Sequence, residues 1–332
     1  MTFHIPPLSS GGIVLSYQCT SSCRHCLYAA SPSWKEWMTQ EDIDTVYRTL
    51  KKHSRFLTGI HLAGGEPFLN PGLLEYAVRR AGDLDIPLDY VETNAFWGTS
   101  DEKTESILTA FKNAGLNRIL VSCTPFHAEF VPLERTRRVI ESGRRILGRG
   151  NVLVYTDFFY RQLRDLHPDR PMILEDYIAL LGEEQAALVL AGECGLIPNG
   201  RAATELAFLY VRRAPSAYFG ETCRRELGNP HHVHIDLYGN YIAGLCAGIS
   251  LGNGYNLDRL YGETDFTGRP VLGCLAEGGV EALFHWARTN YGFEENPEGY
   301  IAKCHLCLDI RRFLVQKQKF SELQPAAFYS NV

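Results

Sequence analysis

The stretch CTSSCRHCLY, residues 19–28, places three cysteines within eight positions, directly after GIVLSYQC, residues 12–19, which is typical of a β-strand. Cysteine thiolates at short spacing hold either a structural zinc ion or an iron–sulfur cluster. A structural zinc ion takes four protein ligands, usually from two CxxC pairs, whereas this CxxxCxxC pattern offers three. Three thiolates suit a [4Fe–4S] cluster in which one iron, without a protein ligand, is open to a small molecule.

The segments around this loop predict the fold. From residue 12 to about residue 191, strand-type runs alternate with amphipathic segments, which predicts six repeats of a strand followed by a helix. The fifth strand is expected at NVLVYTDFFY (151–160) and the sixth at AALVLAG (186–192), while Thr39, with Asp42, and Ser100 are expected to cap helices. We therefore predict an α/β fold with a parallel sheet, as a partial (β/α)6 barrel whose chemistry lies at the carboxyl ends of the strands.

The alternation stops near residue 195, and the remaining chain predicts a small, cysteine-rich α+β domain. It contains a possible hairpin in HVHIDLYGNYIAGLC (232–246), a helix near GVEALFHWARTNYG (279–292) and a last helix from CLDIRRFLVQKQ (307–318). The expected domains are residues 1–195 and 196–332.

Composition limits the classes of function. The formal net charge of -5 gives no electrostatic reason to expect nucleic acid as a partner. The sequence has no apolar run long enough to span a membrane, and its start lacks the features of a secretory signal, so we expect a cytoplasmic protein. In that compartment ten cysteines are expected to be ligands or reactive thiols. The basic runs RTRRV (135–139) and SGRRILGRG (142–150) are expected on a solvated helix face.

The cysteine loop resembles that of the radical S-adenosylmethionine (radical SAM) superfamily. Its CxxxCxxC motif is matched by Cys19, Cys23 and Cys26, with Tyr28 in the aromatic position. The resemblance implies a [4Fe–4S] cluster whose open iron binds the methionine part of S-adenosylmethionine. It further implies an external one-electron reductant of the flavodoxin or ferredoxin type, whose electron leads to a 5′-deoxyadenosyl radical that takes a hydrogen atom from the substrate.

A second motif supports this resemblance, because LAGGEPFLNP (62–71) follows the second predicted strand. Gly64, Gly65, Glu66 and Pro67 match the family's GGEP motif, in which backbone carbonyls and a carboxylate hold the amino group of the cofactor. Glycines allow the backbone to approach it closely. The ends of the third, fourth and fifth predicted strands supply further expected cofactor contacts: Thr93, Asn94, Ser122 and Asp157.

The last third of the chain carries a second cysteine group. GLIPNGRAATEL (195–206), a lone cysteine, GLCAGISLGN (244–253) and a distant CHLC resemble the SPASM or twitch extension of radical SAM enzymes, which holds auxiliary clusters. The chain lacks the full SPASM cysteine pattern, so the resemblance implies one auxiliary [4Fe–4S] cluster, with zinc as the alternative. The expected ligands are Cys223, Cys246, Cys304 and Cys307, and Cys274 is a possible replacement.

The reaction is predicted from a third resemblance. TNAFWG (93–98), GLNRILVSCTPFHAEFV (115–131) and the C-terminal CxxC are similar to the epipeptide epimerases, which act on ribosomally made peptides. In those enzymes a cysteine thiol returns hydrogen to the opposite face of a residue. Cys246 lacks the adjacent cysteine that they carry. Unless Cys246 itself serves, the possible donors are Cys123, Cys194 and Cys274, and Cys123, at a strand end, is the best placed. His127 and Glu129 are expected to position a substrate amide or relay a proton.

Other functions stay open on sequence alone. Cross-linking of a peptide, a radical step on a small molecule, and maturation of a protein or cofactor all fit the same motifs. A non-catalytic iron–sulfur or zinc protein fits the cysteines but not the GGEP motif.

Overall fold

The structure is a computed structural model that describes residues 2–53, 55, 57–164 and 170–332. Internal contacts divide the chain into two compact units. The barrel unit comprises Gly12–Cys23 and Ala30–Gly195. The C-terminal unit comprises Met1–Gly11, Arg24–Ala29 and Leu196–Val332. The cysteine loop therefore contributes residues to both units.

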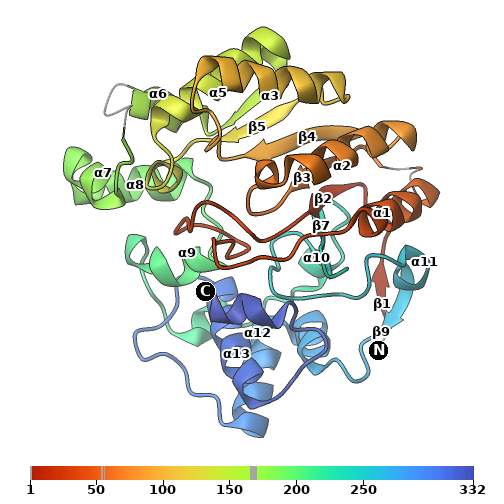
Figure 1. Ribbon diagram of the computed structural model, residues 1–332. Helices are drawn as coiled ribbons and strands as arrows, with labels where there is room; N and C mark the ends of the chain where they lie inside the picture. The colour runs from red at the N-terminus through yellow and green to blue at the C-terminus, as the bar shows by residue number, and fades with distance from the viewer. Residues whose placement is uncertain (1, 54, 56, 165–169) are drawn as a thin grey trace. The chain divides into compact units, whose positions relative to one another are not determined.

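The barrel unit is built on strands that follow one another in the sheet order β6-β5-β4-β3-β2. They are β2 (Ser10–Val14), β3 (Gly59–Ala63), β4 (Leu88–Thr93), β5 (Ile119–Ser122) and β6 (Val152–Tyr155). Figure 1 labels β5, β4, β3 and β2 of this series. The pairs β3–β4, β4–β5 and β5–β6 are parallel. This arrangement confirms the predicted α/β class with a mostly parallel sheet, and it brings the carboxyl ends of neighbouring strands to one edge.

The helices between these strands begin and end close to the predicted positions. They are α1 (Gln40–Lys52), α2 (Pro71–Asp83), α3 (Asp101–Asn113) and α5 (Leu133–Ile146). Thr39 and Asp42 form the predicted capping box of α1, and the Ser100 side chain caps α3 by accepting from the Lys103 N–H. Helix α2 contacts β4, while α5 contacts β5 and β6, so apolar helix faces cover the strands.

Two segments predicted as strand are helical. The run AALVLAG lies within α8 (Glu183–Glu193), which follows α7 (Leu174–Leu181), and Asp157–Tyr160 lies in α6 (Asp157–Arg164). A short apolar run is ambiguous between strand and helix, and here Ala, Leu and the preceding Glu and Gln favour the helix. Among the described residues the barrel unit therefore has five of the six predicted strands.

The C-terminal unit combines two small antiparallel strand pairs with helices. Strand β1 (Thr2–Ile5) pairs with β9 (Gly262–Asp265), which was not predicted, and β7 (Val233–Asp236) pairs with β8 (Tyr241–Ile242) as the predicted hairpin. The helices are α9 (Arg201–Glu205), α10 (Arg224–Leu227), α11 (Leu257–Leu260), α12 (Pro270–Tyr291) and α13 (Lys303–Lys317). Helices α12 and α13 pack against each other, and both were expected from the sequence.

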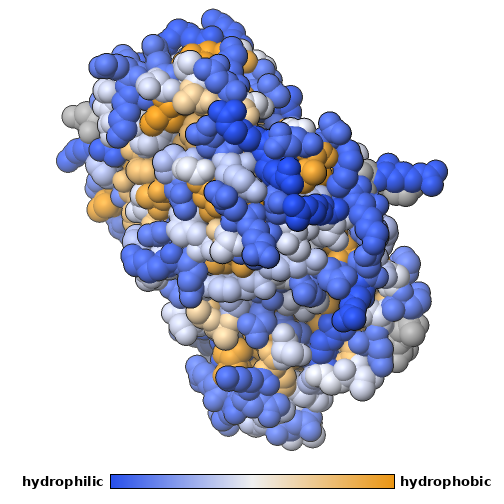
Figure 2. Space-filling view, turned by 45° about the vertical axis from the view of Figure 1, so that its right-hand side comes forward, coloured by the Kyte–Doolittle hydropathy of each residue, from blue (hydrophilic) through white to orange (hydrophobic). Residues whose placement is uncertain are grey.

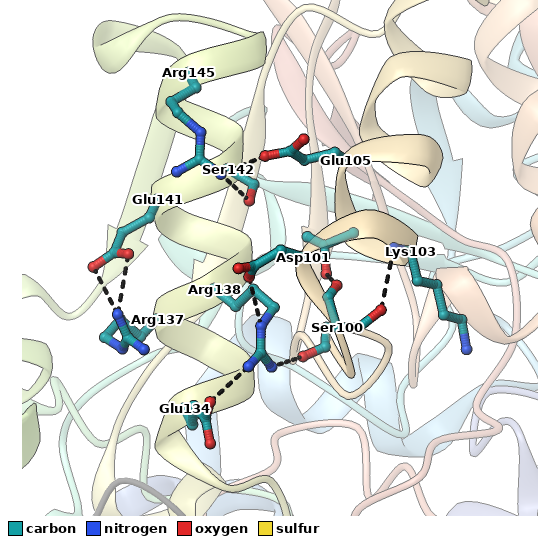
Figure 3. Close-up of polar contacts among 12 residues, drawn as sticks. Ser100, Asp101, Lys103, Glu105, Glu134, Arg137, Arg138, Glu141, Ser142 and Arg145 are labelled. Atoms are coloured by element: carbon teal, nitrogen blue, oxygen red, sulfur yellow. Dashed lines mark hydrogen bonds and ion pairs between the residues drawn. The ribbon is translucent and has the colours of Figure 1, made fainter.

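Helices α3 and α5 are joined by ion pairs on the outside of the barrel unit (Figure 3). Arg138 of α5 donates from Nε to Asp101 Oδ1 (2.8 Å), from Nη1 to Gly98 O (2.7 Å) and from Nη2 to Glu134 Oε1 (2.6 Å). Arg135 donates to Phe96 O (3.0 Å). The prediction of a solvated basic face is wrong for Arg138, whose side chain is only 15% exposed, because α5 uses it to hold the loop after β4.

Replacing Arg138 with alanine is expected to lower the free energy of unfolding of the barrel unit by about 1–2 kcal/mol, because two carboxylates and one carbonyl lose their donor. Arg137 offers a matched control on the same helix, since its ion pair is with Glu141 of α5 itself and its side chain is 39% exposed. Its replacement should cost within about 0.5 kcal/mol. Urea unfolding followed by circular dichroism measures both; equal losses would contradict the prediction.

The surface seen in Figure 2 is largely hydrophilic, with hydrophobic residues in separated groups. Several of the exposed apolar side chains belong to β6 and the helices that follow it, namely Leu153, Tyr155, Phe158, Ile173, Leu180 and Leu188. Within the described parts of the chain, none of the helices is long and apolar enough to cross a membrane.

Candidate functional site

The cysteine loop leaves the end of β2 and is held by backbone hydrogen bonds. In the barrel unit, Cys19 and Cys23 are buried, and the Cys19 N–H donates to Ser31 O (3.1 Å). In the C-terminal unit, Cys26 O accepts from the Arg201 N–H (3.1 Å), and the ring of Tyr28 lies 5.2 Å from that of His234 in an edge-on contact. Backbone hydrogen bonds thus hold Cys19 and Cys26, and Cys23 is held by burial.

The GGEP motif follows β3 and pairs with the chain that leads into the cysteine loop. The Gly65 N–H donates to Ser16 O (2.7 Å), and the Glu66 N–H donates to Gln18 O (2.9 Å). A Cβ on Gly65 would lie 2.0 Å from Gln18 O, which no side chain tolerates. Glycine is therefore required at this position by the close approach of two backbone segments.

Glu66 places its carboxylate in the interior of the barrel unit, where it is 1% exposed. It accepts hydrogen bonds from the Phe68 N–H (3.1 Å), the Thr93 hydroxyl (2.9 Å) and the Asn94 N–H (2.6 Å). Burial raises the pKa of Glu66 to about 7, although these three donors act in the opposite direction. Pro67 begins the short 3-10 helix η2 (Pro67–Leu69) that fixes the turn after the motif.

Thr93 and Asn94, at the end of β4, connect Glu66 with the cysteine loop. The side-chain amide of Asn94 donates to Thr20 Oγ1 (2.9 Å) and Ser21 Oγ (3.3 Å) and approaches Cys19 Sγ (3.6 Å). Thr93 Oγ1 accepts from the Ala95 N–H (3.0 Å) and from Trp97 Nε1 (2.9 Å). The sequence predicted both residues as cofactor contacts, and it missed this scaffolding role.

The end of β5 carries Ser122 and Cys123. Ser122 is half-buried, whereas Cys123 is 2% exposed and lies next to β6, since its N–H donates to Tyr155 O (2.5 Å). Burial, with a smaller effect of the Asp157 carboxylate, raises the pKa of Cys123 to about 12, so the group is a protonated thiol at neutral pH.

His127 lies in the short helix α4 (Pro125–Ala128), one turn beyond Cys123. Its Nδ1 forms a hydrogen bond with the Thr124 hydroxyl (2.8 Å), and burial lowers the pKa of His127 to about 4, so its imidazole is neutral. Glu129 Oε1 accepts from the Leu174 N–H (3.3 Å). Asp157 begins α6, forms an ion pair with Arg161, and shares with it, Phe158 and Gln162 the wall of a hollow of about 530 Å³.

Sequence reasoning missed a pair of ionisable groups on β3 and β4. His61 Nε2 lies 3.7 Å from Glu92 Oε1, and the His61 ring stacks on Tyr90 at a centroid distance of 5.0 Å. Burial raises the pKa of Glu92 to about 7. The signal was available in the sequence, because Tyr90 and Glu92 alternate along β4 with the fully buried Val91. An ionisable residue within a strand of the sheet is a candidate for a polar site.

In the C-terminal unit, four cysteines gather from three segments. Cys304 and Cys307 lie on the first turns of α13, Cys246 follows the β7–β8 hairpin and Cys223 caps α10. Burial raises the pKa of Cys246, and the neighbouring sulfurs of Cys304, Cys307 and Cys223 raise it further. Cys274, on α12, has its pKa raised to about 11 by burial and then by Glu277 and Glu322, without a contribution from another cysteine.

Across the described ranges, no three His, Cys, Asp or Glu side chains are placed to share one metal ion. A cubane cluster differs from a single ion in that each thiolate binds a different iron, so its ligands stand farther apart. The four cysteines, as the structure places them, are therefore not the ligands of a single ion.

Residues 13–150 match the family model of the Radical SAM superfamily. No curated protein matches the chain. Among solved structures, it is similar to BtrN in complex with AdoMet and 2-DOIA (16% identity, TM-score 0.46, covering 83% of this chain and 90% of that one). It is also similar to native anSMEcpe with bound AdoMet (13% identity, TM-score 0.45, covering 93% of this chain and 97% of that one). A third similar structure is HydG, a maturase of the [FeFe]-hydrogenase (13% identity, TM-score 0.34, covering 98% of this chain and 78% of that one). Similarity at this level does not identify a substrate.

The matched region contains the cysteine loop and the GGEP motif, and it is a radical SAM domain. The chain is accordingly an enzyme that uses reductive cleavage of S-adenosylmethionine, with a [4Fe–4S] cluster and S-adenosylmethionine as cofactors. Such enzymes need an electron donor and a substrate. The residues fit these cofactors, because three thiols lie on one loop and the side-chain amide of Asn94 approaches the sulfur of Cys19. Gly64 and Gly65 also let the GGEP motif lie directly against the chain that leads into this loop.

Proposed function

We propose that this enzyme inverts or cross-links a residue of a ribosomally made peptide, with epimerisation as the leading reaction. The observation that carries epimerisation is Cys123, a buried and protonated thiol at the end of β5. Return of hydrogen to a substrate radical requires an S–H bond, and a thiol with its pKa raised to about 12 keeps that bond at neutral pH.

Cys19, Cys23 and Cys26 would hold the cluster, with Tyr28 beside them. Glu66 and the Gly64–Gly65 backbone would hold the amino group of the cofactor, since a carboxylate offers about four lone-pair positions and three are occupied. Ser122, Asp157 and the backbone near Thr93 and Asn94 supply polar groups at the same strand ends. When bound, the cofactor supplies the 5′-deoxyadenosyl group that accepts a hydrogen atom from the substrate.

The proposed epimerisation consists of hydrogen abstraction, hydrogen return and restoration of the thiol. The Cα–H bond of a peptide residue breaks, and its hydrogen atom forms a new C–H bond in 5′-deoxyadenosine. Cys123 then gives its thiol hydrogen to the other face of the Cα radical, which leaves a sulfur radical on Cys123. One electron from the external reductant and one proton from solvent restore the thiol. His127 is placed one turn away, and its neutral imidazole is a suitable carrier for that proton.

A second [4Fe–4S] cluster on Cys223, Cys246, Cys304 and Cys307 would provide a route for that electron. Ligation by four thiolates closes the cluster, which suits electron transfer better than binding of a substrate thiolate. The reductant is proposed to be a flavodoxin or ferredoxin. Ten cysteines and reduced clusters suit a reducing compartment, so we also propose that the enzyme works in the cytoplasm.

Deuterium labelling tests the proposal. The reconstituted enzyme, reduced with dithionite, is incubated in D2O with S-adenosylmethionine and a short peptide encoded beside its gene. We expect 5′-deoxyadenosine and one carbon-bound deuterium in each inverted residue, because thiol hydrogen exchanges with solvent. Cys123→Ser should still form 5′-deoxyadenosine while inversion falls below detection, and Cys194→Ser, which alters another buried thiol, is the matched control.

Three outcomes would each overturn one part of the proposal: the donor, the peptide substrate or the choice of epimerisation over cross-linking. Inversion by Cys123→Ser at the wild-type rate would exclude this donor. An unchanged peptide, with 5′-deoxyadenosine still formed, would direct the search to a small molecule or to maturation of a protein or cofactor. A carbon–carbon or thioether cross-link without deuterium would exclude epimerisation and retain the peptide substrate.

A further inference from the structure

Arg311 is the largest fully buried side chain of the described residues, at 1% exposed. It lies on α13, one turn after Cys307, and donates to Cys307 O (3.3 Å), Ala247 O (2.9 Å), Tyr329 Oη (2.8 Å) and Asn199 Oδ1 (3.3 Å). All four acceptors are neutral. A guanidinium stays charged in proteins, and burial of a charge without a counter-ion is strongly unfavourable.

The counter-ion is not a carboxylate. In the part of the chain that the structure describes, no carboxylate oxygen lies within 4.0 Å of the Arg311 guanidinium, as the ion pairs of the C-terminal unit involve other cations. Among the described residues of this unit, two carboxylates are buried, and both accept from other donors. Glu322 accepts from the Val271 N–H (2.9 Å) and from Ser321 Oγ (3.3 Å), and Asp236 accepts from the Tyr238 N–H (3.0 Å) and the Asn240 N–H (2.8 Å). The anion that Arg311 needs must come from another source.

The hydrogen bonds of Arg311 join two of the three segments that carry the cysteine group. One bond goes to the carbonyl of Cys307 itself, and another goes to Ala247, the residue after Cys246. Tyr329, which accepts from Arg311, in turn donates from its hydroxyl to Gly248 O (2.5 Å), and a Cβ on Gly248 (φ 81°) would lie only 3.0 Å from Arg311 Nη1. The guanidinium is thus held beside two cysteines by rigid backbone.

Lys303 joins the third segment in a similar way. Its ammonium pairs with Glu226 Oε1 (2.9 Å) and Glu221 Oε2 (3.2 Å), which flank Cys223, while Lys303 itself precedes Cys304. Unlike Arg311, Lys303 has its own carboxylates. The two cations fasten the cysteine segments together, but only Arg311 carries a charge that protein carboxylates leave unbalanced.

We propose that Arg311 is the counter-cation of an anionic four-thiolate cluster on Cys223, Cys246, Cys304 and Cys307, and that it raises the reduction potential of this cluster. This inference rests on the auxiliary cluster of the proposed function. Four thiolates outweigh the positive charge of a cluster core, so the centre is an anion and each added electron makes it more negative. A fixed cation at short range favours the reduced form, as charge and hydrogen bonding near the sulfurs set cluster potentials.

The test is a redox titration of the reconstituted full-length enzyme, followed by electron paramagnetic resonance. The auxiliary signal is the one that S-adenosylmethionine leaves unchanged. At the wild-type midpoint potential, R311Q should lower the ratio of reduced to oxidised auxiliary cluster at least tenfold, which is about 59 mV for one electron. R311K keeps the charge and should stay within a factor of about three, and R312Q, one position along α13, is the matched control.

The iron content of the enzyme shows whether a negative result means that the second cluster is absent or that Arg311 does not affect its potential. A wild-type enzyme with about four irons per chain would lack the second cluster and overturn this inference together with the auxiliary site, whereas S-adenosylmethionine cleavage would survive. With about eight irons in R311Q and an unchanged ratio, the charge role is wrong and the auxiliary site stands. Loss of the second cluster in R311Q but not in R311K supports the inference, whereas loss in both shows a purely structural role and overturns it.

Discussion

Replacing Cys19, Cys23 and Cys26 together with alanine is expected to abolish formation of 5′-deoxyadenosine, because without these thiolates the chain has no open iron at the loop after β2. Iron content should fall from about eight to about four per chain, since the proposed auxiliary ligands lie elsewhere. Product is measured by chromatography after anaerobic reduction with dithionite, and iron by a colorimetric assay.

The reciprocal variant, with Cys223, Cys246, Cys304 and Cys307 replaced, is expected to lose the other half of the iron. Cys274→Ala is its matched control, because Cys274 lies in the same unit and its electrostatic neighbours are Glu277 and Glu322 rather than other cysteines. Wild-type cleavage of S-adenosylmethionine in the triple variant would contradict the assignment of the N-terminal thiols. Loss of iron in Cys274→Ala would show that the auxiliary ligand set has been chosen wrongly.

The second large effect is expected at Gly65. An alanine Cβ would lie 2.0 Å from Gln18 O and 2.8 Å from Cys19 N, so the backbone leading into the cysteine loop has to move. We expect a loss of about 1–3 kcal/mol of stability, as for other overpacked sites, and a loss of S-adenosylmethionine cleavage to a few per cent or less. Activity should fall even in molecules that remain folded, because the displaced segment carries Cys19, a proposed ligand of the cluster.

Gly72→Ala is the matched control for this prediction. Gly72 lies in the first turn of α2, seven positions along the chain, and no atom lies within 4 Å of a Cβ built there. Alanine at a helical position is favoured over glycine by about 0.5–1 kcal/mol, so this variant should be at least as stable as wild type and fully active. Equal activity of the Gly65 and Gly72 variants would show that the close backbone approach has no functional role.

A helix could be predicted from the sequence where its hydrophobic periodicity was long and an N-cap residue stood at its start. Helices α1 and α3 have strong periodicity and the side-chain caps of Thr39 and Ser100, and both lie where the sequence indicated. The run at residues 186–192 is apolar throughout, so it has no periodicity that separates strand from helix. The β1–β9 pair joins residues about 260 positions apart, and four-residue strands carry no signal of such a partner.

At the candidate site, the sequence predicts which cofactors bind, and the structure adds the hydrogen bonds that support the motifs. The CxxxCxxC and GGEP spacings point to the cofactors, because local motifs carry that chemistry. The bonds of Asn94 to Thr20 and Ser21, and those of Arg311 to Ala247 and Asn199, depend on which strand ends and turns meet in space. The only trace of Arg311 in the sequence is a basic residue one turn after the second cysteine of a CxxC, which is also a common surface pattern.

The arginines of α5 tie the outermost layer of the barrel unit to its interior. Arg135 and Arg138 bind the carbonyls of Phe96 and Gly98, and this loop begins at Asn94, whose amide supports the cysteine loop. Anyone who re-engineers this helix for solubility or crystallisation should exchange Arg137 or Arg145 and leave the other two in place. Replacement of Arg135 or Arg138 would free the loop after β4, and Asn94, four residues before Gly98, could then no longer be held against the cysteine loop.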